Sequence, residues 1–171
     1  MSAVRPGART AVALTLAGAV TVALWAAACG SPADLTKALQ VAEVSTGWFD
    51  AGIVDGKNKL VPSVSFVLKN TSDRPIASVQ LNVAYWRAGD DGEWDDLYVA
   101  NAIDSNGLAA GAQTGTITAR GKVGYTGEQP RAEILQHQSF VDATARIFAK
   151  RGSSQWMKLG EFPIERRLLI R

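Results

Sequence analysis

The chain has 171 residues, a formal net charge of +2 and a single cysteine, which excludes an internal disulfide framework and any metal site built from several cysteines. Arg5 and Arg9 are the only charged residues before Cys29, so basic and acidic side chains are equal in number from Cys29 onward. A neutral domain has no charge excess to favour nucleic-acid binding, whose affinity comes mainly from basic groups that neutralise phosphates.

The N-terminal segment has the composition of an export signal. Two arginines precede residues 11–28, an uncharged stretch rich in Ala, Val and Leu that ends in small residues just before Cys29. This order is typical of a secretory signal peptide. An uncleaved signal anchor is the alternative, because the length of the stretch approaches the shortest that spans a bilayer.

The end of this segment, Ala27-Ala28-Cys29, resembles the cleavage site of a bacterial lipoprotein signal. The resemblance implies that residues 1–28 are removed and that Cys29 receives acyl chains such as palmitate. The protein would then be anchored in the bacterial cell envelope. Because Gly30 and Ser31 follow the cysteine in place of an aspartate, the resemblance favours the periplasmic face of the outer membrane over the inner membrane or the cell surface.

Residues 29–38 are predicted to be a short tether, which reaches at most about 35 Å when fully extended. Residues 33–39 are also compatible with a helical turn that begins near Asp34, since an acidic residue is favourable at a helix N-terminus.

The rest of the chain is dominated by a period-two alternation of apolar and polar residues, the pattern of strands with one buried face. It is clearest at residues 64–69 and 79–85, on either side of a cluster of turn-forming residues. Further strands are predicted at residues 41–49, 94–100, 114–119, 141–150 and 156–164, with a polar loop at 52–59 and a short helix at 131–138.

Residues 39–165 are therefore predicted to form one all-β domain, an antiparallel immunoglobulin-like β-sandwich of about seven strands with one short helix, preceded by an N-terminal signal helix. A closed barrel is the alternative, because the number of strands does not decide closure. Residues 166–171 form a basic C-terminal tail, which either contacts anionic headgroups or a partner, or is a frayed end.

Several short sequences in this domain resemble those of known proteins. Gly47-Trp48 and residues 56–62, 69–72, 124–127 and 160–163 are similar to segments of uncharacterised bacterial lipoproteins. More loosely, the turn at Asn70, the strand after it and residues 108–111 resemble the FxLYD-type sandwich domains of bacterial envelope proteins. These resemblances imply a fold and a location, and they carry no catalytic residue.

The sequence predicts a protein that is not an enzyme and has no cofactor or metal site. His137 is the only histidine and lies in no H-E-x-x-H motif, and no G-x-S-x-G motif occurs. The cluster of carboxylates at residues 90–96 does not match the EF-hand spacing. A solvated acidic turn is therefore favoured over Ca²⁺ binding.

Trp86, Trp94 and Tyr98 are the candidate interaction surface, because all three lie on one predicted hairpin. Aromatic residues on an exposed strand face anchor protein partners or stack on sugars, although cross-strand packing also explains them. The sequence therefore predicts a lipid-anchored protein-interaction or assembly module with an envelope partner of unknown identity and no nucleic acid. The alternative is a carbohydrate- or small-ligand-binding module that uses the Trp86/Trp94 hairpin.

Overall fold

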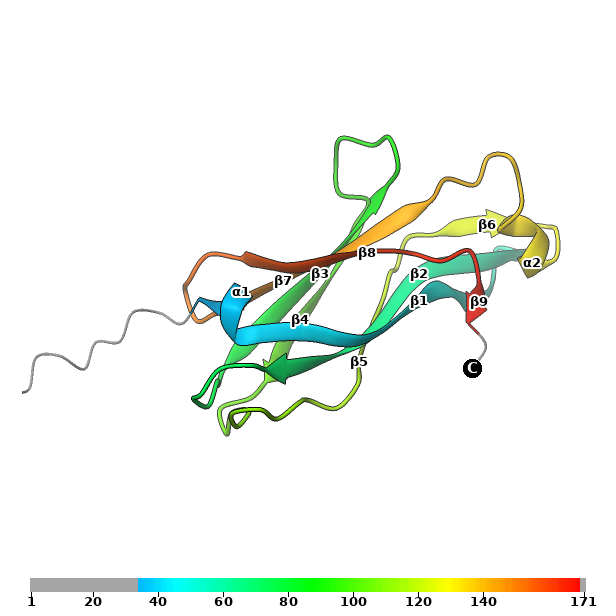
Figure 1. The fold of residues 1–171 in the computed structure, drawn as a ribbon. Helices are drawn as coiled ribbons and strands as arrows, with labels where there is room; N and C mark the ends of the chain where they lie inside the picture. The colour runs from blue at the N-terminus through cyan, green and yellow to red at the C-terminus, as the bar shows by residue number, and fades with distance from the viewer. Residues whose placement is uncertain (1–33, 170–171) are drawn as a thin grey trace, which may run out of the picture. The chain divides into compact units, whose positions relative to one another are not determined.

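The computed structural model describes residues 34–169, so the predicted signal peptide and the lipidation site at Cys29 lie outside the described residues. In chain order the elements are α1 (Leu35–Ala38), β1 (Leu39–Val54), β2 (Lys57–Asn70), β3 (Val79–Arg87), β4 (Asp95–Ile103), β5 (Ile117–Arg120), β6 (Tyr125–Gly127), α2 (Arg131–Ile134), β7 (Ala143–Arg151), β8 (Met157–Pro163) and β9 (Leu168–Leu169) (Figure 1).

The strands form two sheets (Figure 1). One has the order β5-β2-β1-β9, with β6 also paired to β2, and the other has the order β4-β3-β7-β8. The pairings are antiparallel except for the short parallel contact between β1 and β9. The predicted all-β, mainly antiparallel architecture is confirmed.

Alternation along the strands builds a core that both sheets share. In β2 the side chains of Leu60, Val64, Phe66 and Leu68 are fully buried, and they join one apolar cluster with residues of the other sheet, among them Leu81, Val83, Tyr85, Ala145 and Ile147. Two sheets that bury their inner faces against each other have a sandwich-like arrangement.

Tyr85 links the two sheets through the middle of this core. Its hydroxyl in β3 donates a hydrogen bond of 2.9 Å to the carbonyl oxygen of Ala119 in β5. Burial raises the pKa of the Tyr85 phenol well above its ordinary value, because the charged phenolate is disfavoured away from water. The hydroxyl therefore remains a donor to Ala119.

A buried amide organises the connection between β2 and β3. Asn70 is fully buried, and its Nδ2 lies 2.8 Å from the carbonyl oxygen of Arg74 and 3.0 Å from that of Leu108. Its Oδ1 accepts hydrogen bonds from the backbone N–H and the hydroxyl of Ser72. A buried polar group must be satisfied in this way to avoid a large desolvation cost, so Asn70 holds two loops against the end of β2.

The prediction of a loop at residues 52–59 is wrong, because β1 extends to Val54 and β2 begins at Lys57. Their connection is only Asp55-Gly56, and both residues have positive φ angles, 51° and 76°. A two-residue turn of this kind matches the twist of the flanking strands, and Asp-Gly is one of its preferred sequences. A bulge between Asp50 and Ile53 breaks the alternation at this point.

The predicted helix at residues 131–138 is shorter in the structure, where α2 ends at Ile134. No side chain caps its start at Pro130, and a single turn without a cap has little stability of its own. The chain then bends so that Leu135 and Phe140 enter the core. The short strands β6 and β9 were not predicted, since two or three residues carry no periodic pattern.

The helical turn predicted near Asp34 is present as α1. The Asp34 carboxylate accepts a hydrogen bond of 3.1 Å from the backbone N–H of Thr36. Leu35 and Ala38 are buried in the shared core. Residues 34–38 of the predicted tether are therefore packed into the folded domain.

Replacement of Leu35 tests whether α1 is part of the core. Leu35→Ala should lower the free energy of unfolding by about 2–5 kcal/mol, because it removes a fully buried side chain and leaves a cavity. The exposed neighbour Lys37 is the matched control, and Lys37→Ala should change the free energy by less than about 0.5 kcal/mol. Urea unfolding followed by circular dichroism measures both, and two equally small losses would contradict the packing of α1.

Candidate functional site

The three aromatic residues predicted to form a surface divide between two environments, and Trp94 belongs to the interior one. Its ring centroid lies 6.3 Å from that of Trp48 and 5.5 Å from that of Tyr125. The Phe140 ring lies 4.7 Å from Trp48 and 4.6 Å from Tyr125. Trp94 is thus one edge of a packed aromatic cluster.

Trp86 points to the opposite side of β3 from the buried Tyr85, as alternation predicts. Its indole is half-buried, and the guanidinium carbon of Arg146 lies 4.2 Å from the ring centroid. The Nε of Arg146 is in turn 3.2 Å from the Oε2 of Glu161 in β8. One face of the Trp86 ring is therefore covered by a cation that is itself held in place.

Tyr98 is the most exposed of the three, with 52% of its surface accessible. It meets Trp156, whose ring centroid lies 6.2 Å away at an interplanar angle of 89°. Trp156 is 38% exposed, and the Lys150 ammonium lies 4.7 Å from its ring centroid. Tyr98 and Trp156 thus form a solvent-accessible aromatic pair beside a cation.

We call the outward surface of the β4-β3-β7-β8 sheet the aromatic face, defined by Trp86, Tyr98, Arg146, Phe148, Lys150 and Trp156. The last four residues were not predicted. Arg146, Phe148 and Lys150 alternate with the buried residues of β7, so their shared face was readable, but the pairing of β7 with β3 was not. Trp156 precedes β8, where no alternation sets the direction of its side chain.

The acidic residues of the β3–β4 hairpin act mainly as local acceptors. Asp90 pairs with Arg87 at 2.7 Å, and the Asp95 carboxylate accepts hydrogen bonds from the backbone N–H groups of Lys122 and Val123. Burial, followed by repulsion from Asp96, raises the pKa of Glu93. Within residues 34–169, no group of three or more His, Cys, Asp or Glu side chains is arranged to hold a metal ion.

The single histidine has a local role. His137 is exposed, and its Nδ1 accepts a hydrogen bond of 3.2 Å from the backbone N–H of Ser139. A hydrogen bond two residues along the chain shapes the turn between α2 and β7. Within the described residues, no serine or threonine hydroxyl is hydrogen-bonded to the His137 imidazole, as the pairing of a nucleophile with its general base would require.

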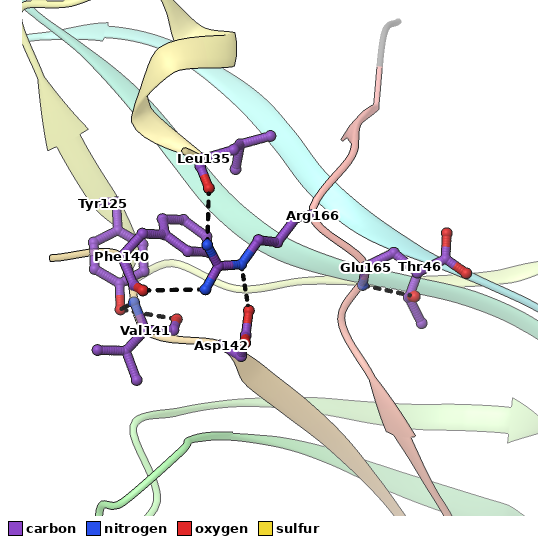
Figure 2. Close-up of polar contacts among 8 residues, drawn as sticks. All are labelled: Thr46, Tyr125, Leu135, Phe140, Val141, Asp142, Glu165 and Arg166. Carbon is purple, nitrogen blue, oxygen red and sulfur yellow. Dashed lines mark hydrogen bonds and ion pairs between the residues drawn. The ribbon is translucent and has the colours of Figure 1, made fainter. Parts of the chain in front are cut away.

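The start of the basic C-terminal tail is hydrogen-bonded to the domain. The alternative prediction of a frayed end is therefore wrong for Arg166 and Arg167. Figure 2 shows the Arg166 guanidinium between Asp142, at 2.6 Å, and the carbonyl oxygens of Leu135 and Phe140, both at 3.3 Å. Arg167 donates a hydrogen bond of 2.7 Å to the carbonyl oxygen of Thr46. These bonds lead the chain into β9.

A surface hollow of about 450 Å³ lies beside this network, lined by Ala132, Leu135, Gln136, Arg166 and Leu168. Arg166 is the only charged residue in this lining, and its guanidinium is already paired with Asp142. The hollow therefore offers no group for acid–base or nucleophilic chemistry.

Comparisons with known proteins assign no family. No family model and no curated protein matches the chain. Among solved structures, the chain is similar to the X-ray structure of Northeast Structural Genomics Consortium target SoR45, with 12% sequence identity over 76% of this chain and 88% of that chain, and a TM-score of 0.45. Among the described residues, no helix has the length and hydrophobicity needed to cross a bilayer.

Two aspartates of the acidic hairpin should differ in their effect on stability. Asp95→Ala should lower the free energy of unfolding by about 1–3 kcal/mol, because it removes a charged acceptor from the backbone N–H groups of Asp96, Lys122 and Val123. Asp91 is exposed and serves as the control, with an expected change below about 0.5 kcal/mol for Asp91→Ala. Thermal and urea unfolding measure both variants, and equal effects would show that the contact of Asp95 with residues 122–123 contributes nothing.

Proposed function

We propose that the protein is a lipid-anchored, non-catalytic component of the bacterial cell envelope, at the periplasmic face of the outer membrane, that binds another envelope protein through the aromatic face. The domain type that fits this role is an immunoglobulin-like sandwich. In support, β1 and β2 pair in one sheet and β3 begins the other, as the first three strands of that type do.

The observation that carries the proposal is the exposed aromatic pair on the β4-β3-β7-β8 sheet. Tyr98 and Trp156 remain accessible although each ring is fixed by a neighbour. Trp, Tyr and Arg are the residues most enriched at the energetic centres of protein interfaces. Rings that are already ordered lose little side-chain entropy when a partner binds, so this face is suited to a protein contact.

The same geometry argues against a sugar platform. Stacking on a sugar needs a free ring face, but Arg146 covers one face of Trp86 and the Lys150 ammonium lies over Trp156. Trp94 packs against Trp48 and Tyr125. The Trp86/Trp94 hairpin therefore lacks two open, coplanar rings, and a protein partner is favoured over a carbohydrate.

A lipid on Cys29 would keep the domain close to the membrane. The chain from Cys29 to Asp34 reaches at most about 18 Å, even when it is fully extended. Two acyl chains give stable anchoring, and anchoring raises the effective concentration of the domain near any partner in the same membrane. A modest contact on the aromatic face would then suffice for assembly.

In-cell crosslinking tests the aromatic face. A photo-crosslinking residue at the exposed Ala100 of β4 should capture a reproducible protein partner, identified by mass spectrometry. Tyr98→Ser combined with Trp156→Ser should reduce the crosslinked product at least tenfold, because both anchors of the contact are removed. Ile53→Ser with Val123→Ser is the matched control, since these side chains are 70% and 42% exposed away from the aromatic face.

Either of two results would contradict the protein contact. One is a crosslinked product that survives loss of Tyr98 and Trp156. The other is the absence of any partner together with quenching of tryptophan fluorescence by envelope glycans, which would favour the carbohydrate-binding alternative.

The anchor is tested separately at Cys29. Cys29→Ser should prevent acylation and move the protein from the membrane fraction to the soluble envelope or the medium, as measured by fractionation and by the intact mass of the protein. Wild-type protein that carries no acyl chains, or a variant that fractionates as the wild type does, would refute lipidation.

A further inference from the structure

We propose that the outward surface of the β5-β2-β1 sheet binds the anionic phospholipid headgroups of the membrane that holds the protein. We call this surface the basic face and define it by Ser45, Lys59, Ser65, Lys69, Thr118 and Arg120. The inference rests on the proposed anchor for its nearness to the membrane. It is independent of the protein contact on the aromatic face, which lies on the other sheet.

The direction of these side chains follows from the pleat of β2. Leu60, Val64 and Phe66 point into the core, so Lys59, Ser65 and the other alternate residues point outward. The register extends the same side to the neighbouring strands, because Ser63 pairs with Arg120 and Ser65 with Thr118. Lys69 pairs with Gln40 at the opposite end of β2 from Lys59.

The cations of the basic face are not neutralised by the domain itself. Several cations outside this face are paired with carboxylates, for example Arg146 and Lys158 with Glu161 and Arg74 with Asp73. By contrast, no carboxylate within residues 34–169 forms an ion pair with Lys59, Lys69 or Arg120. Three unpaired cations therefore remain on one sheet surface of a domain that is neutral overall.

Two acidic residues lie close to this surface. Glu43 is exposed at the bulge of β1, where its carboxylate accepts a hydrogen bond of 3.2 Å from the side chain of Gln113. Glu165 is paired at 3.1 Å with Arg167, which donates a hydrogen bond of 2.7 Å to the Ser45 hydroxyl. Because that pair is neutral, Glu43 is set against three unpaired cations, and the basic face keeps a positive excess.

Arg120 is held in a conformation suited to phosphate. Its guanidinium carbon lies 3.7 Å from the centroid of the Phe49 ring, so the plane is positioned on the sheet surface by a cation–π contact. No hydrogen bond or ion pair in the described part of the chain uses its N–H groups. A planar guanidinium with free donors binds phosphate oxygens in a bidentate manner.

The exposed part of the basic face carries small side chains between the cations. Ser45 and Thr118 are exposed, and the hydroxyls of Ser65 and Thr118 hydrogen-bond to each other at 2.9 Å. Val61, Ser63 and Val67 lie on the same side of β2 but are buried. Headgroups would therefore contact the exposed residues Lys69, Thr118 and Arg120 and the partly exposed Lys59.

We expect the basic face to bind anionic headgroups weakly by itself, and to stay bound when the domain is also anchored in the membrane. Each cation near an anionic membrane strengthens binding by about fivefold, so three give about a hundredfold. That gain would not hold a free domain on a membrane, but a short tether converts the contact into an intramolecular one. The basic face would then set the orientation of the domain, with the aromatic face turned away from the lipid.

The test uses the full-length protein reconstituted into vesicles of phosphatidylcholine, with or without phosphatidylglycerol. A fluorophore at Thr126→Cys reports on the basic face, because Thr126 is exposed and pairs with Lys59, while α1 lies at the other end of β1 (Figure 1). Quenchers on the lipid headgroups should reduce its emission only when phosphatidylglycerol is present. A fluorophore at Ala100→Cys on the other sheet should show no such dependence.

Charge variants test whether the basic face causes the quenching that depends on phosphatidylglycerol. Lys59→Gln with Lys69→Gln should lower the ratio of membrane-bound to unbound orientation by about 25-fold, whereas the matched pair Lys158→Gln with Arg74→Gln should leave it unchanged. The proposal would be overturned if quenching at Thr126 were the same with and without phosphatidylglycerol. It would also be overturned if the two double variants changed the orientation equally. The intact mass separately reports acylation at Cys29, so failure of the anchor is distinguishable from failure of the face.

Discussion

The rest of the structure depends on the register between β1 and β2, which runs from the pair Leu39 and Asn70 to the pair Val54 and Lys57. Side chains alternate along a strand, so the residues that enter the core determine which ones face outward. Burial of Leu60, Val64 and Phe66 places Lys59 and Ser65 on the opposite surface. A slip of one residue would bury the cations, which is prohibitively costly without partners.

The same constraint acts on the second sheet. Tyr85 and Ile147 are fully buried, so Trp86 and Arg146 must lie on the outward surface, where the guanidinium covers the indole. The two sheets are joined by the apolar core and by the hydrogen bond from Tyr85 to Ala119. One core therefore presents two chemically different outer surfaces, one basic and the other aromatic.

The sequence predicts the features that depend only on residues close together in the chain. The alternation of β2, β3 and β7, the capped turn at Asp34 and the outward position of Trp86 all follow from neighbours in the chain. The Asp-Gly turn at Asp55 also follows from neighbours in the chain, because this dipeptide favours a two-residue hairpin turn even within a polar segment.

Features that join distant segments were not predictable from the sequence. Trp94 is packed because Tyr125, 31 positions further along the chain, lies 5.5 Å from it. The start of the basic tail is held against the domain because Arg166 reaches Asp142 and two carbonyl groups of the α2–β7 segment (Figure 2). Trp156 contacts Tyr98 because β4 and β7 lie on either side of β3. Such contacts depend on the topology of the sheets, which one sequence does not specify.

Under the proposed function, a short tether to the membrane would raise the effective concentration of a partner, so the domain would need no deep pocket to bind it. The central claim is that the aromatic face is occupied by a partner in the envelope. Hydroxyl-radical footprinting of the protein in intact envelopes and after purification tests it directly. The account predicts that oxidation of Tyr98 and Trp156 is strongly suppressed in the envelope, while Ile53 and Val123 are oxidised at similar rates in both preparations. Equal oxidation of Tyr98 and Trp156 in the two preparations would contradict it.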